Sequence, residues 1–355
     1  MKPEDLAEGV RAILSHSPSF PGRKLVVDII ANPNAGGFKR RRFAGKRKRE
    51  LNRVVQEALA LPLRAEESQV HLHRTERCGH AAAIAQRVLE RSSANGRDSL
   101  HIIMTAGGDG TSLETAERLV RLPEDQKDRF GLLRLPMGTG NDGSEGRNLV
   151  AALGRFLGPL ALERRPAIQV RPAEDGGKAP LWAFNIASVG LDAYVADRTN
   201  KLKAHFPGDS YKFWVNVATL FYDRAYKVVS LGLKAWDSAG GIVHESETPR
   251  LFVALGVSGN RQYGSNKRIL PDERNGITVS QTSLFRKLLV KGSIEKGFHE
   301  GIREVLHFDA DRIEVRYSER LPLQCDGEVE ELARCDFPLV MERLQGLYNI
   351  IVPAA

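Results

Sequence analysis

Residues 101–114 constrain the fold more than any other stretch of this chain. They read His-Ile-Ile-Met-Thr-Ala-Gly-Gly-Asp-Gly-Thr-Ser-Leu-Glu, so an apolar run leads into glycines around one carboxylate and then into a helical pattern. The backbone must turn sharply where such a strand becomes a helix, and glycines let the main chain come close to a ligand. Because the first amides of the following helix carry partial positive charge, this stretch is typical of a phosphate-binding turn.

The carboxylate of Asp109 lies on this turn, beside the expected anion. It would repel a phosphate unless a metal ion or a reacting hydroxyl stood between them, which points to phosphoryl transfer. The alternative is a tight strand-to-helix turn in which Asp109 only caps the helix. Thr111 and Glu114 also have the spacing of a capping box at the start of that helix.

Three other segments repeat the pattern of a strand, a turn and a helix. Their predicted strands cover residues 25–30, 69–73 and 132–135. The turns that follow are Asn32-Pro33-Asn34-Ala35-Gly36-Gly37, the segment around Thr75, and Pro136-Met137-Gly138-Thr139-Gly140-Asn141-Asp142. Four such units in succession predict a doubly wound parallel sheet, whose turns all open on one edge and can surround a single nucleotide. A Walker A sequence and the dinucleotide fingerprint are both absent, which counts against P-loop kinases and dehydrogenases.

Short alternating strands replace this pattern after about residue 160. They are predicted over residues 167–171, 181–187, 228–236, 251–257, 277–281, 312–317, 321–325 and 338–343. Such a series predicts a β-sandwich. A last strand, 347–352, is expected to return to the first domain.

The charge of the chain points to an anionic partner. The formal net charge is +8, and much of the excess lies in one basic run, made of Lys39, Arg40, Arg41, Arg42, Lys46, Arg47, Lys48 and Arg49. This run is either a solvated helix face or a surface that attracts anionic phospholipid headgroups, at about 1 kcal/mol per charge. Nucleic-acid binding is disfavoured because no aromatic platform or helix-turn-helix pattern accompanies the run.

The composition of the chain indicates the cellular compartment in which the protein is expected. With 42% hydrophobic and 27% charged residues the chain is typical of an ordinary globular protein. No apolar run approaches the ~20 residues of a membrane span, and no signal-peptide core follows Met1. Three cysteines without metal-binding spacing indicate a reducing environment, so we expect a cytoplasmic protein.

The glycine-rich turns resemble the nucleotide-binding motifs of the diacylglycerol kinase catalytic-domain family, which includes bacterial lipid kinases, sphingosine kinases and ceramide kinases. The matching segments, in the family's order, are Asn32-Pro33-Asn34-Ala35-Gly36, Gly107-Gly108-Asp109-Gly110-Thr111 and Pro136-Met137-Gly138-Thr139-Gly140-Asn141-Asp142. The resemblance implies that ATP lies across these turns and Thr75, with Mg²⁺ near Asp109. It also implies an NAD kinase-like α/β domain, a β-rich domain, and an active site in the cleft between them.

The resemblance sets the expected domain boundaries. Residues 1–23 would be an N-terminal extension, and residues 24–158 the nucleotide-binding domain, completed by residues 346–355. Residues 159–345 would form a β-sandwich that binds a lipid. An aromatic stripe within Phe206–Tyr226 would then either line a lipid site or pack in the core.

Cys325-Asp326-Gly327-Glu328 resembles the family's Asp-Gly-Glu turn, whose glutamate is regarded as the proton acceptor. The resemblance assigns that role to Glu328, assisted by Asp326. A carboxylate beside a phosphoryl donor is a suitable base for a hydroxyl. The alternative is a plain hairpin, because Asp-Gly is a common hairpin dipeptide.

Residues 264–276 depart from the family. They resemble a stretch that binds a structural magnesium in bacterial members, but Asn275 stands where an aspartate is expected. A neutral amide is a poorer ligand for Mg²⁺, and Asp272 is the nearby carboxylate that could compensate. The segment after Asp142 also lacks the usual alanine-rich helix start.

The sequence is therefore interpreted as an ATP-dependent kinase of a membrane lipid in phospholipid metabolism, peripheral at the membrane surface. A diacylglycerol-like acceptor is expected, with a sphingoid base or ceramide left open, as is a homodimer. One alternative is a soluble-substrate kinase resembling NAD kinases. The other is a non-catalytic protein that binds nucleotide or lipid.

Overall fold

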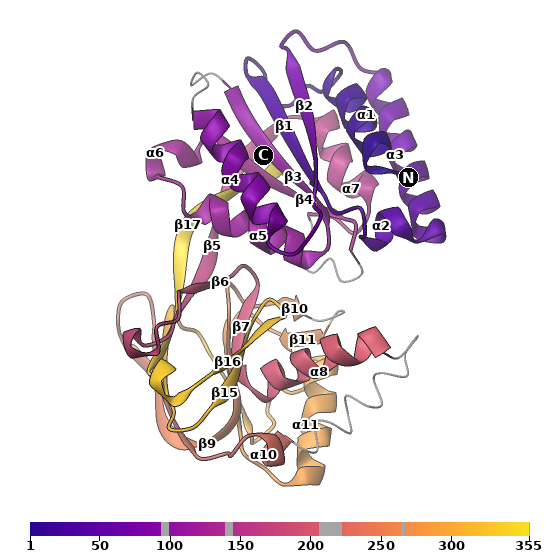
Figure 1. Cartoon of the computed structure of the whole chain (residues 1–355). Coiled ribbons are helices and arrows are strands. Elements are labelled where there is room, and N and C mark those ends of the chain that lie inside the picture. Colours follow the sequence, from indigo (N-terminus) through magenta and orange to yellow (C-terminus); the bar gives the residue numbers. More distant parts are fainter. Residues whose placement is uncertain (94–98, 139–144, 206–221, 264–266, 355) are drawn as a thin grey trace. The chain divides into compact units, whose positions relative to one another are not determined.

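The computed structural model describes the chain except for residues 94–98, 139–144, 206–221, 264–266 and 355 (Figure 1). The described residues form two units. Unit 1 comprises Met1–Arg165 and Gln345–Ala355, and unit 2 comprises Pro166–Leu344. The chain leaves unit 1 within strand β5 (Leu160–Arg171) and returns within strand β17 (Leu339–Pro353).

Unit 1 is built on a parallel sheet. Its strands are β1 (Lys24–Ala31), β2 (Ser68–Arg74), β3 (Ser99–Gly107), β4 (Phe130–Pro136) and the end of β17, in the order β17-β4-β3-β1-β2. The direction in which successive strands are added to the sheet therefore reverses between the neighbours β1 and β3. This position is the topological switch point of a doubly wound sheet. This confirms the predicted α/β fold.

Helices cover both faces of this sheet (Figure 1). They are α1 (Pro3–Leu14), α2 (Gly36–Lys39), α3 (Arg41–Leu59), α4 (His80–Ser93), α5 (Asp109–Val120), α6 (Glu124–Lys127) and α7 (Leu149–Leu153). Helices α1, α3 and α7 pack together, and α4 packs with α5. Strands β1 and β3 are buried along almost their whole length because both of their faces are covered.

Helix α1 belongs to the core of unit 1, although the sequence suggested an N-terminal extension. Its Leu6, Val10 and Leu14 are buried with Leu25 and Val27 of β1. The apolar residues of α1 recur with the helical period, so one face of the helix can pack against the sheet.

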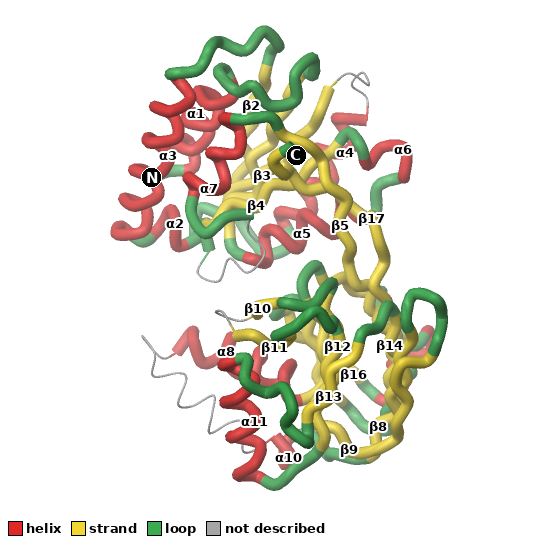
Figure 2. Tube along the Cα trace, turned by 180° about the vertical axis from the view of Figure 1, so that it is seen from behind, coloured by secondary structure: helices red, strands yellow, loops and turns green. Residues whose placement is uncertain are grey.

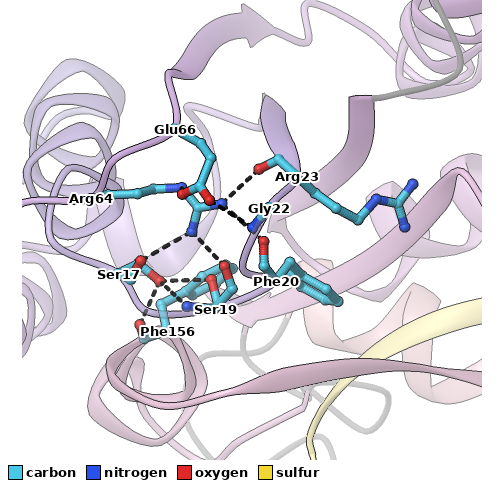
Figure 3. Close-up of polar contacts among 8 residues, drawn as sticks. All are labelled: Ser17, Ser19, Phe20, Gly22, Arg23, Arg64, Glu66 and Phe156. Carbon is cyan, nitrogen blue, oxygen red and sulfur yellow. Dashed lines mark hydrogen bonds and ion pairs between the residues drawn. The ribbon is translucent and has the colours of Figure 1, made fainter.

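Arg64 orders the segment between α1 and β1 (Figure 3). Its guanidinium is almost fully buried and donates to four backbone carbonyl groups, those of Ser17, Ser19, Phe20 and Arg23. The Glu66 carboxylate accepts from the Gly22 N–H at 2.6 Å. Burial lowers the pKa of Arg64, against the opposing effect of Glu66. A segment that reads as a linker is therefore fixed in place.

Unit 2 is an antiparallel β structure (Figure 2). After β5 it contains β6 (Leu181–Ala183), β7 (Ile186–Gly190), β8 (Ser230–Trp236), β9 (Ile242–Gly256), β10 (Arg261–Tyr263), β11 (Lys267–Leu270), β12 (Gly276–Ser280), β13 (Val305–Phe308), β14 (Arg312–Arg316), β15 (Leu321–Cys325) and β16 (Glu328–Leu332). The first half of β9 pairs with β8, and its second half pairs with β7 and β12.

The long strand β9 thus takes part in two layers that share one core. Leu233 of β8 and Ile313 of β14 are buried in the same cluster as Val189 of β7 and Leu323 of β15. Inward-facing apolar residues from both layers create the sandwich that the alternating strands predicted. The strands predicted over 338–343 and 347–352 are one continuous strand, β17.

Among the described residues of unit 2, these strands are accompanied by the helices α8 (Leu191–His205), α10 (Tyr222–Ala225) and α11 (Leu284–Lys296). Helix α11 was not predicted from the sequence. Most of the aromatic stripe predicted over Phe206–Tyr226 lies outside the described residues, but Tyr222 and Tyr226 are buried beside Tyr194.

Candidate active site

The register of the parallel sheet aligns the turns that the sequence singled out. Ala31 at the end of β1 pairs with Arg74 of β2 and with Ala106 of β3, and Gly107 pairs with Pro136 of β4. The residues that follow these four strands therefore lie on one edge of unit 1. In open α/β sheets this edge, at the switch point, is where ligands bind.

The turn after β1 is tied to its neighbours by backbone hydrogen bonds. The Asn32 N–H donates to the Ala106 carbonyl of β3 at 3.0 Å, and the Gly37 N–H donates to the Met137 carbonyl at 2.9 Å. The Asn32 side chain accepts from the Asn34 N–H at 2.9 Å, which closes a local turn. The turn, which includes Pro33, continues through Ala35, the N-cap residue of α2, to Gly36, where that helix begins.

The two glycines after β3 have different surroundings. A Cβ on Gly107 would lie 2.3 Å from Thr111 Oγ1, so this position has no room for a side chain. A Cβ on Gly108 would meet no heavy atom of the described residues within 4 Å. Gly108 is the N-cap residue of α5, and Asp109, Gly110 and Thr111 form its first turn. Helix amides therefore begin where open space is available for an anion.

The capping box predicted from Thr111 and Glu114 is wrong. Helix α5 begins at Asp109, two residues before Thr111, so Thr111 already lies inside the helix and is not its N-cap residue. The carboxylate of Glu114 instead accepts from the backbone amides at the start of α4, those of Gly79, Ala81 and Ala82, at 2.8, 3.0 and 3.3 Å. A protein carboxylate thus satisfies the first amides of α4.

Thr75 is fixed by its backbone, because its N–H donates to the Ala31 carbonyl at 2.8 Å. Of the fourth turn, Gly138 is described, whereas Thr139, Gly140, Asn141 and Asp142 lie outside the described residues.

The altered segment beyond this turn is anchored by Glu145. Its carboxylate is almost fully buried and pairs with the Arg134 guanidinium of β4 at 2.7 Å. The Arg155 guanidinium donates to the Glu145 carbonyl at 2.5 Å. A buried ion pair therefore replaces the helix start that the family pattern would place here.

The basic run is mostly solvated. All of its side chains are exposed except that of Arg47, which pairs with Glu50 at 2.6 Å. Glu50 also accepts from the Leu149 N–H at the start of α7, at 3.1 Å. Arg47 is therefore a structural residue, and the run's remaining members are the ones available to an anionic surface.

In unit 2, Asp326 and Gly327 form the two-residue turn between β15 and β16. Both have positive φ, +51° and +95°, and Cys325 pairs with Glu328 across the turn. The Asp326 carboxylate accepts from three backbone amides, those of Phe184, Asn185 and Ile186, at 2.5, 2.9 and 2.8 Å. Glu328, the first residue of β16, is exposed. The turn is a hairpin, and the two carboxylates that it carries differ in surroundings.

A cavity of about 50 Å³ lies near this turn within unit 2. Its walls are mainly apolar and include Leu251, Ile269 and Val290, and the carboxylate-bearing Asp192 also lines it. The Gln324 amide of β15 connects the two features. Gln324 accepts from the Gly327 N–H at 2.8 Å, and its Nε2 lies 3.4 Å from Asp192 Oδ2.

The proposed metal ligands outside unit 1 have other partners. Asp272 accepts from the Arg274 backbone N–H at 2.8 Å and from its Nε at 2.9 Å, and this pairing lowers the pKa of Asp272 to about 2. Asn275 is buried, donates to the Ala310 carbonyl at 2.8 Å and accepts from the Ala310 N–H at 2.9 Å. An aspartate could not make both bonds, because an ionised carboxylate only accepts.

The two side chains that the resemblance offers as ligands of a structural magnesium, Asp272 and Asn275, thus both have protein partners. Within the part of the chain that the structure describes, no three His, Cys, Asp or Glu side chains converge to hold a metal ion. Mg²⁺ bound to ATP needs fewer protein ligands, since phosphate oxygens and water supply the others. Asp109 remains a suitable residue for that ion.

Residues 27–152 match the family model described as the diacylglycerol kinase catalytic domain. Two curated relatives, each named "Probable lipid kinase YegS-like", come from Yersinia pestis (strain Pestoides F) and Yersinia pseudotuberculosis serotype O:1b (strain IP 31758). Each is 28% identical over 171 residues, which is 48% of this chain and 52% of the relative. The chain thus spans about half the length of the curated relatives it matches.

Two solved structures extend the similarity over nearly the whole chain. Both are of a "putative diacylglycerol kinase" from Bacillus anthracis str. Sterne and are 20% identical to this chain. Their TM-scores are 0.56 and 0.58, covering 93% and 94% of this chain and 97% of each structure. At this identity the likeness shows the fold. The family model and the curated relatives support the resemblance of residues 27–152 to the diacylglycerol kinase catalytic-domain family.

Several residues around these turns were not predicted from the sequence. Glu114 was assigned to the wrong helix, and Arg134, Asp192 and Gln324 were not singled out. Each acts on a residue that is distant along the chain, so local spacing carries no signal for it.

No described helix is long and apolar enough to span a bilayer.

Proposed function

We propose that this protein is an ATP-dependent lipid kinase, which transfers the γ-phosphate of ATP to a lipid hydroxyl. The observation that carries the proposal is the hairpin turn with Glu328, connected through Gln324 to an apolar cavity in unit 2. The match of residues 27–152 to the family model supports the phosphoryl-transfer half of the proposal. The relatives' printed names support a lipid acceptor.

ATP would bind at the turns on the sheet edge of unit 1. The phosphates would meet the first amides of α5 at the open side of Gly108, and the turn from Asn32 to Gly36 would border them. Asp109 would hold the Mg²⁺ of ATP, an ion that neutralises charge on the phosphate oxygens. Thr75, Gly138 and the residues 139–142 complete the proposed binding set.

The acceptor proton would go to Glu328. As the lipid oxygen forms its bond to the γ-phosphorus, the bond from phosphorus to the β–γ bridging oxygen breaks, and ADP leaves. The hydroxyl proton is transferred to the Glu328 carboxylate, which is exposed and can therefore be approached by the substrate. Asp326 is engaged by three backbone amides, so we assign it a positioning role in this turn.

The acceptor would place part of an apolar chain against the cavity of unit 2, which at about 50 Å³ is much smaller than a whole lipid. Leucine, isoleucine and valine side chains suit an acyl or alkyl chain, and Asp192 provides a hydrogen-bond acceptor for a hydroxyl. A diacylglycerol-like lipid fits this chemistry, as do a sphingoid base and ceramide. We propose a peripheral position at the membrane surface, because such acceptors reside in bilayers.

The test is ATP consumption in the presence of individual lipids. Labelled ATP would be incubated with the protein and diacylglycerol, ceramide, sphingosine or phosphatidylglycerol in mixed micelles. We expect label to enter one lipid class and the transfer to be lost in Glu328→Gln. Transfer to NAD with no lipid labelled would favour a soluble-substrate kinase. ATP or lipid binding without turnover would favour a non-catalytic binding protein.

A further inference from the structure

Helix α11 carries large apolar side chains on its outer face. The exposed fractions are 44% for Leu284, 81% for Phe285 and 64% for Leu289, and Phe298, just beyond the helix, is 78% exposed. We call these four residues the α11 patch. Leaving aromatic and leucine side chains in water is unfavourable, so a patch of this kind on one helix indicates a binding surface.

The inner face of the same helix forms part of the cavity wall. Lys287, Val290 and Ile294 are buried there and line the cavity, and they recur at the spacing of one helix face. The Lys287 ammonium pairs with Asp223 of α10, which holds the helix against unit 2. Figures 1 and 2 both draw α11 on the outside of the unit 2 strands. One helix therefore separates an apolar cavity from an apolar outer surface.

The charges on α11 select among possible partners. The helix contains four basic residues, Arg286, Lys287, Lys291 and Lys296, and one acidic residue, Glu295. Arg286 pairs with Glu304 at 2.9 Å, and Lys296 is exposed. With Arg286 and Lys287 paired, the helix still has more basic than acidic residues, so a second copy of this chain docked on the same patch would bring two helices of like charge together, which is unfavourable. Apolar side chains flanked by basic residues are the composition of helices that lie in an anionic membrane interface.

We propose that the α11 patch inserts into the interface of an anionic bilayer. The helix would then lie at the lipid surface with the cavity directly behind it. The role of this membrane contact rests on the proposed function, because a lipid kinase must take its acceptor from a membrane. It differs from the sequence-based expectation, which assigned membrane contact to the basic run of unit 1.

The experiment measures binding of the full chain to vesicles without ATP or acceptor lipid. Vesicles of phosphatidylcholine, with and without phosphatidylglycerol, would be separated by flotation. We expect a variant with Phe285→Ser, Leu289→Ser and Phe298→Ser to bind the anionic vesicles at least about tenfold more weakly, since burial of each side chain contributes to partitioning. Because these three side chains are exposed, we expect the variant to fold, and unchanged thermal unfolding would verify this.

Matched controls come from the same chain. Leu63 is 75% exposed in unit 1, so Leu63→Ser removes a comparable side chain away from the patch and should leave binding unchanged. In a second readout, Phe285→Trp should shift its fluorescence to shorter wavelength on adding anionic vesicles, whereas Leu63→Trp should not. Equal binding by the triple variant, with loss instead in a variant neutralised at Arg40, Arg41 and Arg42, would overturn the proposal.

Other outcomes separate this inference from the proposed function. Weak vesicle binding by the triple variant, together with normal phosphorylation of micellar lipid, would support both. Patch-dependent binding in a protein that phosphorylates no lipid would support the inference and refute the function. A dimer in sedimentation that dissociates with Phe285→Ser would show that a second copy covers the patch, and would refute membrane insertion.

Discussion

Asp326→Asn tests whether this carboxylate anchors the hairpin turn or accepts the substrate proton. In the folded protein Oδ1 accepts from the amides of Asn185 and Ile186, and Oδ2 accepts from that of Phe184. An asparagine has one oxygen and one NH₂ group, and the NH₂ group cannot accept. The arrangement that keeps the most bonds places NH₂ against the Phe184 N–H, so one bond is lost and two donors face each other.

The size of the effect follows from these bonds. Losing a hydrogen bond to a charged group costs about 1.5–3 kcal/mol, and the other two bonds weaken because the acceptor is now neutral. We therefore expect Asp326→Asn to lower the free energy of unfolding of unit 2 by about 3 kcal/mol. Asp326→Ala should cost about 5 kcal/mol, because it removes all three bonds and leaves alanine at φ +51°, a left-handed conformation that aspartate tolerates better than alanine.

The assay is urea unfolding followed by tryptophan fluorescence. All three tryptophans, Trp182, Trp214 and Trp236, belong to residues 166–344, so the signal reports on unit 2. Glu328→Gln is the matched control, because this neighbouring side chain is exposed and should change stability by less than about 0.5 kcal/mol. An Asp326→Asn protein with unchanged stability but no kinase activity would refute the anchoring role and identify Asp326 as the proton acceptor.

Three further predictions follow from particular contacts. Gly108→Val should abolish ATP binding without lowering the melting temperature, whereas Gly107→Val should destabilise unit 1, because of these two glycines only Gly107 lacks room for a side chain. Calorimetry measures the melting temperatures, and nucleotide titration measures ATP binding. Normal ATP affinity in a folded Gly108→Val protein would contradict the phosphate site. Glu328→Gln should reduce lipid phosphorylation by ~10²-fold or more with ATP affinity unchanged, and near-normal turnover would exclude it as the base. Burial lowers the pKa of His101 and of His307 from 6.5 to about 4, so the unfolded chain takes up protons before the folded chain as the pH falls. The free energy of unfolding should therefore be highest above pH 6.5 and should decrease towards pH 4, by up to about 3 kcal/mol per histidine. Urea unfolding measures this dependence, and a free energy of unfolding that stays constant from pH 6.5 to pH 4 would contradict it.

Features of this protein that depend on neighbours along the chain could be predicted from the sequence. Apolar runs followed by small-residue turns were sufficient to predict the parallel sheet, because each strand and its turn are written in one continuous segment. Since parallel strands end on the same edge, the juxtaposition of Asn32, Thr75 and Gly108 also followed without coordinates. The same holds for the hairpin at Asp326, because a two-residue turn is set by its own dipeptide.

Contacts between side chains that are distant along the chain became apparent only in the folded structure. Glu114 satisfies the start of α4 instead of its own helix, and Asn275 binds the backbone of Ala310, a residue 35 positions away. The three amides that hold Asp326 come from about 140 residues earlier in the chain. Local spacing cannot predict such partners, because a buried polar group takes whichever donor or acceptor the packed chain brings within reach. For the same reason the apolar pattern of α11 did not reveal which face would be covered and which would be left exposed.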